Sequence, residues 1–156
     1  MVDELSSRVD LGVLLGLAYQ TVIDDLRRTL AAKGFDDLGS AYGYVFRALA
    51  DGPLHLTDLA ARLGITDQGM VKIVNEMEAR GYVERKPDPD DGRAKLVLLA
   101  ARGRQALGTA RRFHAAYEKR LAETWGASDV ATLRSVLERV VGTTGIDAAH
   151  ARLRAI

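Results

Sequence analysis

Apolar residues recur at helical spacing over two short stretches in the middle of the chain. The first stretch begins at Thr57, a residue type that caps helices, and ends at Gly64. The second begins at Thr66, another capping residue, and ends at Gly81. Its apolar face is formed by Met70, Ile73, Val74 and Met77. Two short helices separated by a tight turn predict a helix-turn-helix.

The residues that follow Gly81 predict a β-hairpin. Tyr82–Arg85 and Ala94–Leu99 are short runs with the alternating or continuous apolar character of strands. The stretch Pro87–Gly92 between them consists of residue types that are typical of turns. Because a hairpin directly after a helix-turn-helix forms a wing, residues 53–104 predict a winged helix-turn-helix.

Longer apolar helices are predicted on both sides of this centre. One occupies residues 5–33, and a shorter helix that opens at Ser40 supports the winged motif. After the wing we expect a helix over residues 101–125, another that Ser128 caps, and a short helical tail over 146–156. One chain of this size cannot cover all these apolar faces, which favours pairing with a second copy. A monomeric helical bundle remains the alternative.

Charge and cysteine content narrow the classes of function. The chain has 156 residues and a formal net charge of +1, and residues 53–104 hold nine Lys and Arg against eight Asp and Glu. Composition therefore gives no indication of DNA binding, and only the placement of the cations can do so. The chain contains no cysteine, which excludes disulfides, thiolate metal sites and a thiol redox switch.

No segment has the length of a membrane span or the pattern of a signal peptide. The longest apolar stretch near the N-terminus, Leu11–Tyr19, is too short to span a bilayer. We therefore expect no membrane partner and a location in the cytoplasm.

Residues that could support metal binding or catalysis do not form a complete site. The turn carboxylates Asp88, Asp90 and Asp91 resemble part of a calcium loop, but the closing glutamate is missing, so we interpret them as turn formers. Asp90 or Asp91 can instead brace Arg93 or Arg85. The three histidines have no metal-ligand spacing, and neither a nucleophile elbow nor a phosphate-binding glycine loop occurs. We expect no metal, no cofactor and no enzymatic activity.

The stretches LTDLAARLGIT and GYVERKPDPDDGRAKLVLLAARGR resemble the MarR family, the multiple-antibiotic-resistance type of bacterial transcriptional repressors. The resemblance implies a single domain over residues 1–156, mainly α with a small β-hairpin wing. In it the winged helix-turn-helix occupies about 38–100, and helices over about 5–33 and 101–156 form a two-fold dimer. The resemblance also implies that Arg93 reaches the DNA minor groove from the wing tip.

The sequence departs from the family pattern at the start of the second short helix. Family members often carry a Ser-Thr pair there, whereas this chain has Gln68 and Gly69. The family's sequence preference therefore does not transfer. Asn75 and Gln68 can address adenine edges, and Lys72 can address guanine or phosphate. Ala100 stands where the family usually has a threonine that caps the next helix.

We therefore predict a homodimeric, sequence-specific regulator that binds an inverted repeat in double-stranded DNA, a repressor that a small aromatic or hydrophobic effector releases. The candidate DNA-binding residues are Thr66, Gln68, Gly69, Val71, Lys72, Asn75, Arg85, Lys86, Arg93 and Lys95. The candidate effector-binding residues are Tyr19, Tyr42, Tyr44, Phe46, His55 and Phe113, and the favoured alternative for each of them is that it fills the core. Two alternatives are a winged-helix module that binds protein instead of DNA, and an all-helical enzyme.

Overall fold

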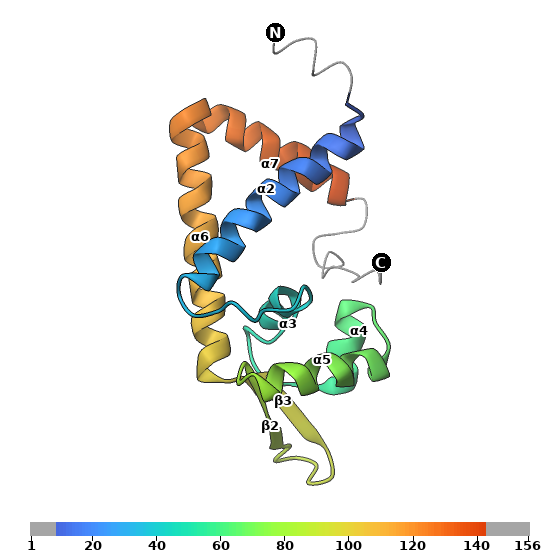
Figure 1. Ribbon diagram of the computed structural model, residues 1–156. Helices are drawn as coiled ribbons and strands as arrows, with labels where there is room; N and C mark the ends of the chain where they lie inside the picture. Colours follow the sequence, from blue (N-terminus) through green and yellow to red (C-terminus); the bar gives the residue numbers. More distant parts are fainter. Residues whose placement is uncertain (1–8, 143–156) are drawn as a thin grey trace. The chain divides into compact units, whose positions relative to one another are not determined.

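The computed structural model describes residues 9–142 and is mainly helical with one small sheet (Figure 1). In chain order its elements are α2 (Leu11–Ala31), α3 (Tyr42–Ala48), β1 (Leu54–His55), α4 (Leu56–Leu63), α5 (Asp67–Ala79), β2 (Val83–Pro87), β3 (Lys95–Leu99), α6 (Ala101–Trp125) and α7 (Ala127–Gly142). Backbone contacts divide the chain into two compact units, Met1–Asp36 and Asp37–Ile156. No helix in residues 9–142 is long and apolar enough to cross a membrane.

The first unit contains α2, which exposes most of its apolar side chains. Leu11 is 72% exposed and Leu17 is 56% exposed, whereas Leu30 is the buried residue of this helix. The helix was expected over residues 5–33; it covers 11–31, and residues 5–8 lie outside the described part. The exposed leucines of α2 form an apolar surface, which is typical of a site that contacts another molecule.

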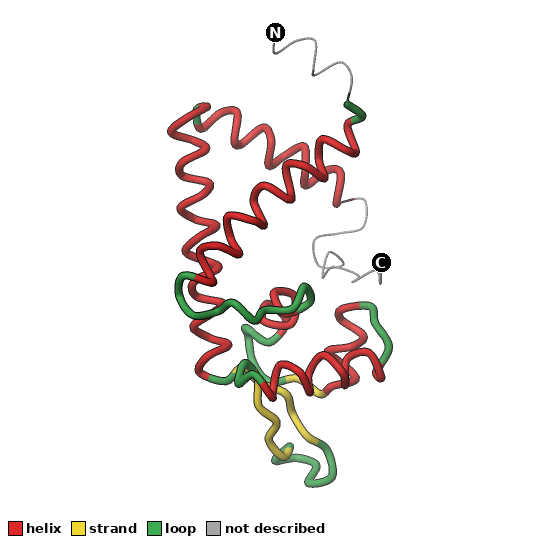
Figure 2. The backbone as a smooth tube through the Cα atoms, in the orientation of Figure 1, coloured by secondary structure: helices red, strands yellow, loops and turns green. Residues whose placement is uncertain are grey.

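The second unit contains the winged helix-turn-helix, as the hydrophobic pattern predicts. Its sheet has the order β1-β3-β2 with antiparallel pairing throughout, so that Leu54 faces Val97 and Val83 faces Leu99. Figure 2 shows β2 and β3 extending from the helices, joined by the wing loop. The core beneath them includes the fully buried Val45, Leu59, Leu63, Met70, Val74, Met77, Tyr82, Val83 and Val97.

The strand β1 was not predicted, and it changes where α4 begins. We expected Thr57 to cap this helix, but the helix starts at Leu56 directly after the strand, and His55 occupies the cap position without a side-chain hydrogen bond. The antiparallel pairing of His55 with Leu96 fixes the backbone up to the helix start. A two-residue strand is too short to leave a periodic signal in the sequence.

The cap at α5 agrees with the prediction, and the cap at α7 does not. The Thr66 hydroxyl accepts a hydrogen bond from the Gly69 N–H at 3.0 Å. Ser128 lies inside the first turn of α7, because the helix begins at Ala127 immediately after Gly126, whose φ of 96° ends α6. The helix predicted over 146–156 lies outside the described residues.

Helix α6 leaves the wing at a close approach between two backbone segments. An ideal Cβ on Gly103 would lie 2.1 Å from the carbonyl oxygen of Tyr82. The same oxygen accepts a hydrogen bond from the Ala100 N–H at 3.0 Å. Only a residue without a side chain fits here. Ala100 provides no side-chain cap, as its residue type predicts.

Candidate nucleic-acid interface

One face of α5 is polar and exposed, and the opposite face is buried. The exposed face carries Gln68, Val71, Lys72 and Asn75 at helical spacings of three, four and seven residues, so these side chains form one row. Val71 is an apolar residue on this row and is 40% exposed. The buried face consists of Met70, Val74 and Met77. We call α5 the recognition helix, because its exposed row has the polarity of a base-contacting surface.

The wing holds Arg93 at its tip through hydrogen bonds in the turn. The Asp88 carboxylate accepts a bond from the Asp90 N–H at 2.9 Å, and the Asp91 carboxylate accepts one from the Arg93 N–H at 3.0 Å. The aspartates are thus turn formers, as predicted, and Asp91 braces the backbone of Arg93. Where β2 passes into the wing loop, His55 Nε2 lies 2.9 Å from Asp88 Oδ2 and ties β1 to the hairpin.

Arg85 connects β2 to the recognition helix. One of its terminal nitrogens, Nη2, donates to Asn75 Oδ1 at 2.7 Å, and the other, Nη1, pairs with the Glu78 carboxylate. Arg85 is only 20% exposed at its side chain, and Glu78 is 41% exposed. Sequence reasoning missed Glu78, because a pair seven residues apart across a helix end has no periodic signature.

A second polar cluster anchors the far end of the recognition helix. The Asp37 carboxylate accepts hydrogen bonds from the Tyr82 hydroxyl and from Arg102, the latter at 3.2 and 3.3 Å. Arg80 donates to the Asp37 carbonyl at 2.7 Å and to the Tyr42 hydroxyl at 2.9 Å. We call these five residues the Asp37 cluster. It joins the segment before α3, the end of α5 and the start of α6, and no sequence signal identified it.

The electrostatics of this cluster favour the charged form of its carboxylate. The hydrogen bond from Tyr82, together with the guanidinium of Arg102, holds the pKa of Asp37 below its usual value although burial opposes this shift. Burial, with the charge of Glu76 nearby, raises the pKa of the Tyr42 hydroxyl and keeps it a neutral donor or acceptor. Asp37 is therefore an ionised acceptor at neutral pH.

The predicted DNA-binding cations differ in their surroundings. Lys72, Arg93 and Lys95 are exposed. Lys86 lies 3.3 Å from Glu84, at an exposed ion pair that solvent weakens. The recognition helix and wing thus carry three exposed cations that have no ion pair within residues 9–142. Their placement, and not the net charge, distinguishes this face.

None of the six residues considered for effector binding is among the lining residues of the cavity that the second unit contains. Tyr42 and Phe46 are buried, and their rings pack edge-on or tilted against the ring of Tyr82 at centroid distances of 5.7 and 5.6 Å. Phe113 is buried beside Tyr117. The others are Tyr44, which is partly buried, His55, which pairs with Asp88, and Tyr19, which is 54% exposed on α2.

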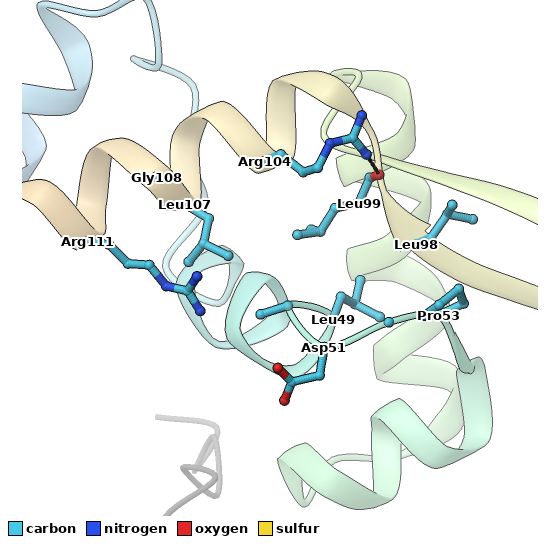
Figure 3. Close-up of a pocket in the computed structure, with 11 residues that line it drawn as sticks. Leu49, Asp51, Pro53, Leu98, Leu99, Arg104, Leu107, Gly108 and Arg111 are labelled. Atoms are coloured by element: carbon cyan, nitrogen blue, oxygen red, sulfur yellow. Dashed lines mark hydrogen bonds between the residues drawn. The ribbon is translucent and has the colours of Figure 1, made fainter.

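A cavity of about 450 Å³ lies instead between the end of α3, strand β3 and the first half of α6 (Figure 3). Its apolar wall comprises Leu49, Pro53, Leu98, Leu99 and Leu107. Arg104 donates to the Leu99 carbonyl at 2.7 Å and is thereby fixed at the strand end. Arg111 and Asp51 lie on another side of the cavity, as Figure 3 shows. Sequence reasoning named none of these residues, since they converge only in the fold.

Within the described residues, no group of three or more His, Cys, Asp or Glu side chains could hold a metal ion.

Comparison with known proteins connects this geometry to one family. The model of the MarR family matches residues 36–94, which span the helix-turn-helix and most of the wing. Uncharacterised proteins of Mycobacterium tuberculosis and Mycobacterium bovis are 27% identical over 93 residues, a match that covers 60% of this chain and 65% of theirs. The chain thus spans just under two thirds of the length of these curated relatives.

Solved structures resemble the chain over most of its length. The transcriptional repressor CouR, bound to a 23-mer DNA duplex, is 29% identical with a TM-score of 0.67, covering 90% of this chain and 97% of that one. A MarR-family regulator from Rhodococcus sp. RHA1 is 25% identical with a TM-score of 0.62, covering 87% and 95%. Reduced MarR from Escherichia coli, at 23% identity, shares the fold with a TM-score of 0.66, covering 85% and 96%.

Proposed function

We propose, on the premise that this chain belongs to the MarR family, that it is a transcriptional regulator that binds an inverted-repeat operator as a homodimer. The observation that carries the proposal is the exposed row on α5 beside a wing that presents Arg93. A helix with such a row fits the major groove, and a wing-tip arginine fits the minor groove. The duplex bound to CouR supports the same use of this fold. No catalytic step belongs to this function, and we propose that it operates in the cytoplasm.

The exposed side chains of the recognition helix and wing divide into base-contacting and phosphate-contacting groups in this proposal. Gln68, Val71, Lys72 and Asn75 face bases, and Arg93 enters the minor groove. Lys86 and Lys95 hold phosphates, which gives affinity without choosing a sequence. Thr66 and Gly69 place the first N–H groups of α5, where a phosphate can approach the positive end of the helix.

Dimerisation through the terminal helices is part of the proposal. No residue of α7 is buried, and its apolar residues Leu133, Val136, Leu137, Val140 and Val141 are 38–62% exposed. A second copy of the chain would cover this surface and that of α2, which fits a two-fold operator. We expect Leu137→Glu to yield monomers by light scattering, whereas Ser135→Glu on the same helix leaves the dimer intact. A dimeric Leu137→Glu protein contradicts this assignment.

We further propose that the regulator is a repressor that a small molecule releases. The support is the cavity at β3 and α6, whose volume lies within the usual range for small-molecule sites. An apolar wall next to the guanidinium of Arg111 suits an apolar or aromatic carboxylate. Because the walls belong to the wing and to the helix that leaves it, an occupant would favour one relative arrangement of the two.

The test of DNA binding is selection from random duplex DNA with the purified protein. The proposal expects a shared inverted repeat with half-sites about one helical turn apart, roughly 34–36 Å. Absence of enrichment at low salt would favour the alternative, a winged-helix module that binds protein through the same face. Near-neutral overall charge is the observation on which that alternative rests.

The effector is tested by titrating a panel of aromatic carboxylates into the protein–operator complex. A binder should release the operator and raise the melting temperature of the free protein. Arg111→Met should abolish both effects, and Arg112→Met, one residue along and outside the cavity lining, should abolish neither. Release that survives in Arg111→Met places the effector elsewhere.

A further inference from the structure

We infer that Asn75 contacts bases as a hydrogen-bond donor, because Arg85 occupies its carbonyl oxygen, and that it therefore prefers guanine or thymine to adenine. The inference rests on the proposed function, since it assigns the base specificity of the same recognition helix. It also replaces the expectation from sequence that Asn75 addresses an adenine edge.

The orientation of the Asn75 amide follows from the chemistry of its neighbour. Arg85 Nη2 lies 2.7 Å from the amide. A guanidinium has donors and no acceptor, so the amide atom that faces it must be the oxygen. The amino group of Asn75 therefore points away from Arg85, on the exposed face of α5.

Arg85 is itself held in place, which makes the arrangement persistent. Its other terminal nitrogen pairs with Glu78 on the recognition helix, and its side chain is only 20% exposed. A charge-assisted pair of this kind is stronger than a neutral hydrogen bond. Glu78 and Arg85 thus act as positioning residues for Asn75, from α5 and β2 respectively.

Each base edge presents its own set of hydrogen-bond donors and acceptors in the major groove, and this set decides which bases Asn75 can bind. Asparagine binds adenine with two bonds, accepting from the N6 amino group and donating to N7. Here a second donor to Oδ1 would have to approach beside the guanidinium, whose positive charge repels the partly positive amino group of adenine. Adenine N7 can still receive one bond from the amino group, but the adjacent N6 amino group is then left without an acceptor. Guanine offers the two acceptors N7 and O6, and thymine offers O4, so both suit a donor better.

The experiment compares sites selected from random duplex DNA by the wild type, Asn75→Ala, Arg85→Met and Arg85→Lys. Asn75→Ala should lose base preference at one position per half-site, which identifies the contacted position. In the wild type that position should be guanine or thymine. Arg85→Met frees the carbonyl oxygen, and the adenine share at that position should rise by about fivefold, the equivalent of one net hydrogen bond. Arg85→Lys keeps a donor and should retain the wild-type preference.

Arg27→Met is the matched control, because it removes an exposed guanidinium from α2, outside the recognition helix and wing. It should select the wild-type site, and circular dichroism should show all variants folded. Adenine at the wild-type position, an unchanged base in Arg85→Met, or an unaltered site in Asn75→Ala would each overturn the inference while leaving DNA binding intact. No selected site for the wild type would overturn the proposed function and this inference with it.

Discussion

Gly103→Ala should destabilise the protein, whereas the same substitution at Gly108, five residues along the same helix, should not. The Cβ of an alanine at position 103 would lie 2.1 Å from the carbonyl oxygen of Tyr82, where ordinary contacts between carbon and oxygen begin at about 3.3 Å. The obstacle is backbone, which cannot rotate away. Either α6 or the start of β2 must move by about 1 Å.

The expected magnitude combines three effects. Overpacking of this kind costs about 3 kcal/mol. The displacement also weakens the hydrogen bond from the Ala100 N–H to the same oxygen, worth about 1 kcal/mol. The higher helix propensity of alanine offsets ~1 kcal/mol of this loss, because glycine destabilises a helix interior by about that amount. The net loss is about 3 kcal/mol, which lowers the melting temperature by roughly 6–12 °C for a chain of this size.

The matched variant isolates the clash from helix propensity. A Cβ at Gly108 would meet only the end of the Arg112 side chain at 3.3 Å, which can move. Gly108→Ala should therefore gain up to ~1 kcal/mol and melt about 2–4 °C higher than the wild type. Both variants are melted by circular dichroism at one protein concentration, since dimerisation makes the midpoint concentration-dependent. A Gly103→Ala protein as stable as the wild type would refute the close approach.

Three further predictions concern the recognition helix, the Asp37 cluster and the wing. Thr66→Ala removes the cap of α5 and should cost about 1 kcal/mol in urea unfolding. Asp37→Asn should be less stable than the wild type at pH 7. Because the folded pKa of Asp37 is lowered, the advantage of the carboxylate is fully present above its unfolded pKa of about 3.9 and is lost as pH falls through the lower folded pKa. Unfolding curves at pH 7 and pH 3 check the sign. Arg93→Ala should weaken binding to every sequence and reduce the salt slope of log K by about 1, and an unchanged slope excludes Arg93 from the DNA contact.

The parts of the fold that the sequence predicts are those with local signals. Thr66 caps α5 and Gly64 ends α4 in a left-handed conformation, each through contacts with residues only a few positions away. The wing turn depends on aspartates that bond to backbone within two residues. Such interactions depend on residue type and spacing alone, so a sequence displays them directly.

The contacts and elements that could not be predicted from the sequence depend on residues far apart in the chain. Asp37 contacts Tyr82 and Arg102, which follow it by 45 and 65 residues. Arg104 and Arg111 approach the α3 end only because α6 passes beside it. The strand β1 exists because β3 pairs with it, and two residues carry no periodicity of their own. Long-range polar contacts of this kind are specified by the fold, and single-residue patterns do not encode them.

The Asp37 cluster bears on how a ligand signal could reach DNA. Arg80 lies at the end of the recognition helix and Arg102 lies in the first turn of α6. Both donate to Asp37, and Arg102 also donates to the Arg80 carbonyl. The recognition helix and the start of α6 are therefore joined by charged hydrogen bonds. In the proposed regulator, a ligand at the cavity on α6 would act by its differential affinity for two conformations, and bound operator would weaken that ligand by the same factor. Asp37→Asn loosens this connection, so it should reduce the factor by which ligand and operator oppose each other even where both still bind.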